Sequence, residues 1–295
     1  MKVILFSLFV ALLMVGCAES SQPSEDVNMT DAASKKFDIK SGIESAGGPQ
    51  SLAGIDLDDP STFDEILSGA INLHKLEKRG KQGEEIYYLP KDNKPYTGWW
   101  ENTHPSGQLV ALTQMKNGKQ NGLMLVWHLN GKKSMKANFK QGKPNGLMTM
   151  WDENGQKESD TNYKDGKKDG LMTVWWTGES GKYGKKKLEG SFRDGKKEGP
   201  HKTWYPEGQK DSEAIYKEGE VVGDFWVWHS NGQKWFKESY KEGKKDGTWI
   251  EWDKDGWKKW EKNWRDGKKE GVWTNYNEDG TEQSRSTYKD GEIVD

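Results

Sequence analysis

The sequence predicts an all-β protein: an elongated, single-layer, twisted antiparallel sheet of about eight stacked β-hairpin repeats, preceded by a short helix-and-strand cap. Three observations predict this fold. A glycine recurs at steps of 24 residues, with one step of 29, and periods of this size indicate repeat arrays. Asn-Gly and Asp-Gly pairs separate short apolar runs, as in hairpin turns. Hydrophobic content is 32%, but aromatic content is 12% with 16 Trp, which suits thin β structure covered by large rings. The opening glycines are Gly98, Gly122, Gly146, Gly170, Gly199, Gly223, Gly247 and Gly271.

Residues 1–17 have the form of an export signal. Lys2 precedes an apolar run over residues 3–15, which is too short for an ordinary membrane span. Small residues flank Cys17, the only cysteine of the chain. The segment resembles a bacterial lipoprotein signal, in which this cysteine is lipidated; a plain secretory signal with an incidental cysteine is the alternative. We therefore expect a signal peptide and lipobox, membrane anchoring through a lipid on Cys17, and an exported protein of the bacterial cell envelope.

Residues 18–54 are rich in Ser, Asp, Gly and Ala and show little apolar periodicity. Such a segment cannot bury enough apolar surface to offset its chain entropy, so we expect a disordered acidic tether. Residues 18–65 hold 11 acidic and 3 basic residues, a net charge of −8, in a chain whose overall charge is −2. The array behind this leader is only mildly basic, which does not favour nucleic acid as a partner.

Residues 55–97 are predicted to form a cap on the first repeat, because the terminal units of an array need an atypical end. The stretch 59–67 is typical of a helix start, with Ser61 as the N-cap and Gly69 as the end. Residues 85–89 form a short aromatic run between Gly83 and Pro90, which indicates a strand.

Residues 98–295 comprise the eight repeats, and the unit opened by Gly122 represents them. It predicts a strand over 123–129, a turn at Asn130-Gly131, a second strand over 133–140 and a turn at Gln141-Gly142. Eight such units imply about sixteen strands.

Aromatic residues recur at two offsets, and the turn decides whether the two sets share a face. A two-residue loop at Asn130-Gly131 places Trp127 on the face opposite Phe139, whereas a three-residue loop ending in a glycine bulge places both rings on one face. We favour the second register, because it gathers the aromatic side chains on one side. The second-strand set is Phe139, Tyr163, Phe192, Tyr216, Tyr240, Trp264 and Tyr288.

The repeated motif Gly-Lys-x-x-Gly, a Trp or Tyr five residues after the second glycine, Asn-Gly and then Tyr-Lys-Asp-Gly resembles the MORN repeat, in the variant of bacterial YwqK-type antitoxins. The resemblance covers residues 98–295 and implies a single twisted antiparallel sheet of stacked hairpins. Three departures are an insertion over 176–187, the junction 219–223 that lacks the lysines, and Thr103 in place of the first Trp.

Two sets of side chains are candidates for binding. One is a ladder that is either the core of the sheet or an exposed platform for sugars, peptides or bases. The other is a basic rim that either solvates the turns or attracts anionic lipid or glycan. The candidate ladder is Trp127, Trp151, Trp175, Trp204, Trp228, Trp252 and Tyr276, and the candidate rim is Lys167, Lys168, Lys196, Lys197, Lys244, Lys245, Lys268 and Lys269.

The sequence shows no catalytic constellation, cofactor motif or metal site, so we expect a protein that is not an enzyme. Its histidines lack ligand-like spacing. The loop 178–182 lacks the glycine spacing of a phosphate loop, and the acidic residues Asp56, Asp58 and Asp59 lack the glycine and distal glutamate of a calcium loop. We read these three residues as helix-capping charge.

We therefore expect an envelope-anchored binding or scaffold lipoprotein whose partner is a protein, with anionic lipid or glycan as a second class of ligand. The family resemblance adds an alternative, an antitoxin or immunity protein that neutralises a partner toxin.

Overall fold

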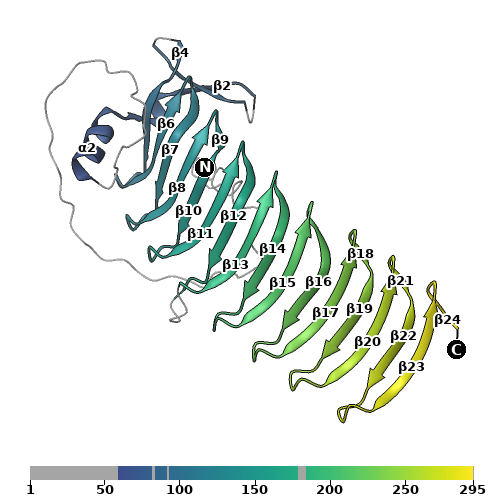
Figure 1. Ribbon diagram of the computed structural model, residues 1–295. Helices are drawn as coiled ribbons and strands as arrows, with labels where there is room; N and C mark the ends of the chain where they lie inside the picture. Colours follow the sequence, from purple (N-terminus) through teal and green to yellow (C-terminus); the bar gives the residue numbers. More distant parts are fainter. Residues whose placement is uncertain (1–58, 82–83, 92, 179–183, 295) are drawn as a thin grey trace. The chain divides into compact units, whose positions relative to one another are not determined.

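The computed structural model describes residues 59–81, 84–91, 93–178 and 184–294. The predicted signal, Cys17 and acidic tether lie outside the described residues. The described residues contain one α-helix, one 3₁₀-helix, a long sheet and a separate three-stranded sheet (Figure 1). The all-β repeat fold is confirmed.

The long sheet is built by strands that pair antiparallel with their neighbours along the chain. One short strand, β1 (Ile71–Asn72), pairs in parallel with the first strand of the array, so the sheet is mixed rather than purely antiparallel. The strands of the array are β5 (Gly98–Thr103), β6 (Leu109–Lys116), β7 (Lys119–Trp127), β8 (Lys133–Lys140), β9 (Lys143–Pro144), β10 (Gly146–Trp151), β11 (Lys157–Lys164), β12 (Lys167–Trp175), β13 (Lys186–Arg193), β14 (Lys196–Trp204), β15 (Lys210–Lys217), β16 (Glu220–Trp228), β17 (Lys234–Lys241), β18 (Lys244–Lys245), β19 (Gly247–Trp252), β20 (Lys258–Arg265), β21 (Lys268–Lys269), β22 (Gly271–Tyr276), β23 (Glu282–Lys289) and β24 (Glu292–Ile293).

In four units the first strand begins three residues before the opening glycine, which corrects the predicted start at residue 123. Strand β7 runs through Gly122, whereas in three other units the strand is divided just before the glycine, as between β9 and β10. Gly122 has a φ of 111°, a backbone conformation that residues with a side chain rarely adopt. These three divisions, the parallel strand β1 and the carboxyl-terminal strand β24 bring the sheet to 21 strands, where the repeats predict about sixteen.

Two kinds of turn alternate along the array. At the first kind, the Gly131 N–H donates to the His128 carbonyl at 2.9 Å and the His128 N–H donates to the Lys132 carbonyl at 2.9 Å. This is the expected three-residue loop with a glycine bulge. At the second kind, Gln141 and Gly142 both have positive φ, 52° and 79°, as a two-residue type I′ turn requires.

The favoured register is nevertheless wrong, because a second bulge follows the first turn. Val126 pairs with Met135 but Trp127 pairs with Lys133, so Ser134 is an extra residue on the second strand. Since Val126 lies on the side of Phe139, the next residue, Trp127, lies on the other side. The same shift recurs at Trp151, Trp175 and later units. We call the two sides the Trp127 face and the Phe139 face.

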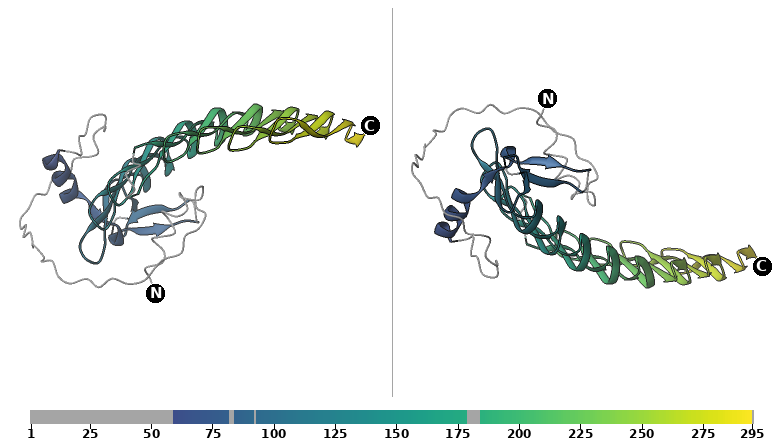
Figure 2. Two further views of the ribbon diagram at one scale, coloured as in Figure 1. Left: turned by 90° about the horizontal axis from the view of Figure 1, so that it is seen from below. Right: turned by 90° about the horizontal axis from the view of Figure 1, so that it is seen from above.

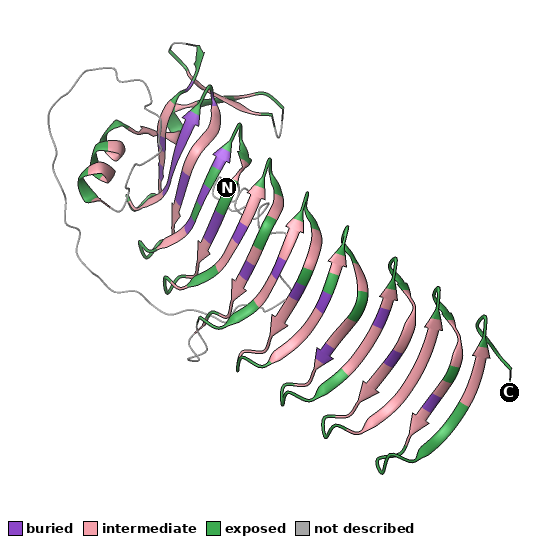
Figure 3. Ribbon diagram, in the orientation of Figure 1, coloured by how far each residue is buried: buried purple, intermediate pink, exposed green. Residues whose placement is uncertain are grey.

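Burial is concentrated at the amino end of the array (Figure 3). On the Phe139 face the buried cluster comprises Met124, Met135, Ala137, Phe139 and Met148. Further along, most strand residues are half-buried. A single-layer sheet covers its faces only with its own side chains, so this part of the array has no thick core.

The cap covers both faces of the first hairpins. A three-stranded sheet of β2 (Glu77–Arg79), β3 (Ile86–Leu89) and β4 (Lys94–Pro95) packs Tyr87 and Leu89 near Trp100, on the Phe139 face. The helix α2 (Pro60–Gly69) lies on the other side (Figure 2). The aromatic strand is confirmed, but the sequence did not predict the small sheet around it.

Helix α2 ends at Gly69, as predicted, but its N-cap is Asp59 rather than Ser61. The Asp59 carboxylate accepts a hydrogen bond from the Thr62 N–H at 2.9 Å, and hydroxyl and amide donors lower the pKa of Asp59 to about 2. Asp59 therefore has the predicted capping role, and Asp56 and Asp58 lie outside the described residues.

Candidate binding surface

The candidate Trp ladder forms one line along the Trp127 face, and all seven of its rings are half-buried. From the second repeat on, the first strand ends on a ladder residue, and six of these seven residues pair with a lysine on the following strand: Lys133, Lys157, Lys186, Lys210, Lys234 and Lys258. Tyr276 pairs with Glu282 instead. The ladder is thus neither a closed core nor a fully exposed platform.

Lysines occupy the ring faces of this ladder. The Lys157 Nζ lies 5.5 Å from the centroid of Trp175, and the Lys210 Nζ lies 4.8 Å from that of Trp228. Lys258 takes the same position over Tyr276, at 5.3 Å. These are cation–π distances. A sugar or base that stacks on these rings would have to displace the lysines, so the geometry does not favour a stacking platform.

Acidic side chains neutralise the same lysines. Lys157 is 2.9 Å from the carboxylate of Asp160, and Lys210 is 2.6 Å from that of Glu213. Lys186 and Glu189 form the equivalent pair in the fourth repeat. Each pair joins residues three positions apart and is partly exposed, so it adds little to the stability of the fold. Its main effect is that the carboxylate offsets the positive charge of the lysine on this face.

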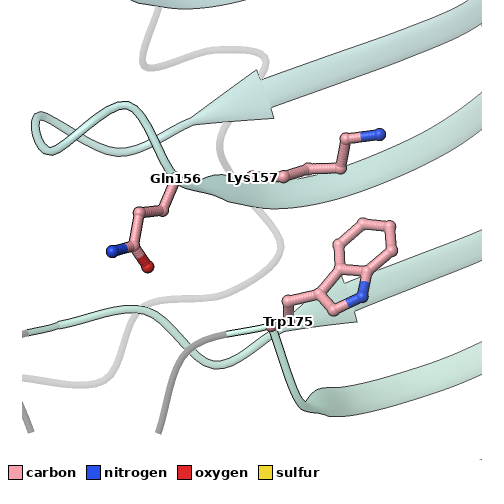
Figure 4. Close-up of a pocket in the computed structure, with 4 residues that line it drawn as sticks. Gln156, Lys157 and Trp175 are labelled. Atoms are coloured by element: carbon pink, nitrogen blue, oxygen red, sulfur yellow. The ribbon is translucent and has the colours of Figure 1, made fainter. Parts of the chain in front are cut away.

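A hollow opens where one such lysine faces the next ring (Figure 4). It is lined by Gln156, Lys157, Trp175 and Gly184 and has a volume of about 390 Å³. Lys157 and Trp175 reach it from neighbouring strands β11 and β12. Residues 179–183 of the insertion lie outside the described residues.

Apolar side chains on the Trp127 face flank the ladder. Leu147 and Leu171, each one residue after an opening glycine, are 46% and 48% exposed. Thr149 and Thr173 lie between these leucines and the ladder residues Trp151 and Trp175. Because threonine is small, the leucine and the tryptophan on either side of it project further from the sheet and are the side chains that a partner would contact.

The structure divides the lysine pairs of the candidate rim. The first lysine of each pair is exposed, and Lys196 is 3.1 Å from the carboxylate of Glu218 in the next turn. The second lysine of each pair, half-buried, lies over a ring of the Phe139 face: Lys168 over Phe192, Lys197 over Tyr216, Lys245 over Trp249 and Lys269 over Trp273, at 5.2, 4.5, 3.9 and 4.5 Å. The rim therefore consists of Lys167, Lys196, Lys244 and Lys268 alone.

The acidic residues before the opening glycines join neighbouring repeats. The Glu198 carboxylate accepts a hydrogen bond from the Glu218 N–H at 3.0 Å, and the Asp246 carboxylate accepts one from the Asp266 N–H at 3.1 Å. Asp169 and Glu270 make the same contact with the following turns. The recurrence of these acids at one offset is a sequence signal of this role.

Residues that follow the ladder positions also join repeats. The His128 Nε2 is 2.9 Å from the Trp151 carbonyl, and the His229 Nε2 is 3.3 Å from the Trp252 carbonyl. The Tyr205 hydroxyl donates to the Trp228 carbonyl at 2.8 Å. These side chains thus have a structural partner in the next repeat.

Neither a metal cluster nor a spanning helix is found in the part of the chain that the structure describes. Among those residues, no three His, Cys, Asp or Glu side chains are grouped so that they could hold a metal ion. No helix there combines the length and the apolar character needed to cross a membrane.

A row of rings lies at the carboxyl end of the Phe139 face, and the sequence patterns missed two of its members, Trp249 and Trp273. It runs from Tyr240 through Trp249, Trp264 and Trp273 to Tyr288, with centroid separations of 5.6, 5.7, 5.1 and 4.7 Å. The Trp249 Nε1 donates to the Ser239 carbonyl at 3.1 Å, which anchors its ring to the sheet. Trp249 and Trp273 both lie two residues after an opening glycine, a recurrence that could have revealed the row.

The comparisons with known proteins agree with this architecture. A family model described as a MORN repeat variant matches residues 144–165 and 197–218. The first match runs from β9 through β11 and the second from β14 to the turn after β15, so each contains a ladder tryptophan and a three-residue turn. A search of curated proteins finds no match. The two family matches support a MORN-repeat protein that binds or scaffolds through its repeats.

Proposed function

We propose that the protein is a non-enzymatic binding or scaffold lipoprotein of the bacterial cell envelope, anchored by a lipid on Cys17. Its partner is a protein that contacts the Trp127 face. The observation that carries this proposal is the half-exposed apolar stripe formed by Leu147 and Leu171 beside the ladder. Exposed apolar stripes rimmed by polar residues are typical of protein-binding surfaces.

A protein partner fits this face better than an anionic lipid or glycan. The ring faces of the ladder are occupied by lysines, as Lys157 over Trp175 shows. Those lysines are themselves paired with carboxylates such as Asp160, so the positive charge of the face is neutralised locally. Apolar contact and shape, rather than charge, then decide what the face binds.

The anchor is tested by growth with a labelled fatty acid. We expect label on the wild type and none on the Cys17→Ala variant, and we expect only the wild type to remain with the membrane fraction. Equal labelling of the two proteins would contradict the anchor and leave the binding surface to be judged separately.

The partner is tested by in-cell photo-crosslinking with benzoylphenylalanine at position 171. We expect a protein adduct from this position and a much weaker one from position 129, where Leu129 is exposed in a turn. No adduct from position 171, or equal adducts from both positions, would contradict a protein-binding face. If the adduct is a toxin whose activity the full chain suppresses, the antitoxin function replaces the scaffold function.

A further inference from the structure

We infer that the Trp127 face of the two repeats opened by Gly146 and Gly170 binds a short amphipathic helix of the partner protein. This inference rests on the proposed binding function and names the kind of segment that the face accepts. It starts from a contact inside the protein: the cap helix α2 already lies on this face one repeat earlier.

Helix α2 shows how a helix occupies the ladder. The Phe63 ring meets the Trp127 ring edge to face, with centroids 5.9 Å apart and an interplanar angle of 72°. Phe63, Ile66 and Leu67 are half-buried, whereas Asp64 and Glu65 are exposed. The helix therefore uses one apolar side, spaced i, i+3 and i+4, to cover the face.

The next two repeats keep the leucine and the tryptophan of this surface but replace the buried leucine between them with threonine. The repeat beside α2 offers Leu123, Leu125 and Trp127 on this face, and Leu125 is only 2% exposed. The following repeat has Leu147, Thr149 and Trp151 at the same offsets, and the one after it has Leu171, Thr173 and Trp175. Leu147 and Leu171 are the exposed members of these triads, whereas Leu123 in the covered repeat is half-buried.

The apolar surface changes character beyond these repeats. The next repeat carries Pro200 and Lys202 before Trp204, and the one after it has Asp224 in the leucine position. Asp224 forms an ion pair with Lys237 at 3.0 Å. The leucine–threonine–tryptophan surface is thus two repeats long, and continuity with the α2 contact points to a second helix of similar length as its occupant.

The test uses a fluorescent peptide with the sequence of residues 59–70, held helical by a hydrocarbon staple between positions 61 and 65. Ser61 and Glu65 are exposed and lie on the side of α2 away from Phe63, so the staple leaves the apolar side open. Anisotropy is measured with the full chain. We expect saturable binding that falls by about tenfold or more when the peptide carries Phe63→Ala, because one aromatic anchor dominates such contacts.

Variants of the full chain locate the site. Leu147→Glu and Leu171→Glu should each weaken peptide binding by about tenfold or more. Val272→Glu is the matched control, because Val272 is 37% exposed and follows the opening glycine Gly271 in a repeat without the leucine triad. We expect this control to bind within about twofold of the wild type, and circular dichroism should show all three variants folded.

Three results would overturn the inference. They are no saturable binding, equal weakening by Val272→Glu and Leu171→Glu, and self-association of the protein that Leu171→Glu abolishes, which would make a second copy the occupant. The assay does not depend on Cys17 or on the native partner. A photo-crosslink from position 171 without peptide binding would support the proposed protein-binding function and contradict a helix as the bound segment. Peptide binding without a photo-crosslink would show that the face accepts a helix and contradict the proposed function.

Discussion

The contact between Gly190 and His201 gives a sharp test of how this thin sheet is packed. The two residues are cross-strand partners on β13 and β14, on the Phe139 face. A Cβ added at Gly190 would lie 2.2 Å from the His201 Cδ2 and 2.5 Å from its Nε2. The ring is 6% exposed and is held edge-on between Phe192 and Tyr216, at centroid distances of 5.3 and 4.8 Å.

Gly190→Ala should therefore destabilise the array through steric overlap alone. Gly190 does not have a positive φ, so alanine can adopt its backbone conformation. The overlap involves a ring with neighbours on both sides, and overpacking of this kind costs about 1–3 kcal/mol. We expect the midpoint of thermal unfolding to fall by about 2–4 °C for each kcal/mol, as for chains of 150–250 residues.

A second substitution should restore the loss. Ala137 and Met148 occupy the equivalent positions of two earlier repeats and pack in one buried cluster, so Gly190→Ala combined with His201→Met recreates a pair that the array already packs. Gly69→Ala is the glycine control, because a Cβ there meets nothing within 4 Å. Thermal unfolding and hydrogen exchange of β13 and β14 measure the effect. An unchanged midpoint in Gly190→Ala, or a double variant as unstable as the single one, would refute the packing argument.

Two further predictions concern the same array. Burial lowers the pKa of His201 below its ordinary value of about 6.5, so the unfolded chain binds the proton more readily, and the unfolding free energy should fall as the pH drops below about 6.5. His201→Met should lose this slope in pH-dependent thermal melts, and a slope that persists would assign it to other groups. Glu242 has a φ of 49° in a type I′ turn, where asparagine is better tolerated, so Glu242→Asn should raise the unfolding free energy by up to about 1 kcal/mol. Asp266→Asn, at the equivalent turn, is the control with little expected gain, and a loss of stability in Glu242→Asn would contradict the turn assignment.

The sequence predicted the repeats well because their information is local. The turn at Asn130-Gly131 and the turn at Gln141-Gly142 depend on the φ that one or two residues can adopt, and the strand between them follows as predicted, Lys133–Lys140. The end of α2 at Gly69 was found for the same reason. Its N-cap was misplaced by two residues because Asp59 and Ser61 are both good capping residues.

The face of each side chain could not be predicted in this way. The ladder and Phe139 lie on opposite faces because one extra residue, Ser134, enters the second strand next to Trp127. No dipeptide marks this bulge, and a shift of one residue reverses the side on which every later side chain lies. Successive residues of a strand point to opposite faces, so the two lysines of each pair also separate. Lys197 lies over the Tyr216 ring, whereas Lys196 lies in the rim.

By itself the sequence determined the hairpin unit, its count and its turns, since glycine and asparagine restrict the backbone within a few residues. Only the tertiary structure decided which rings share a face, which acids join the repeats and where α2 lies. The last two depend on contacts between residues 20 or more positions apart, such as the Glu218 N–H with Glu198 and Phe63 with Trp127. The first depends on the bulge where Trp127 pairs with Lys133. Strand pairing and bulges bring such residues together, and the period of the sequence does not encode either one.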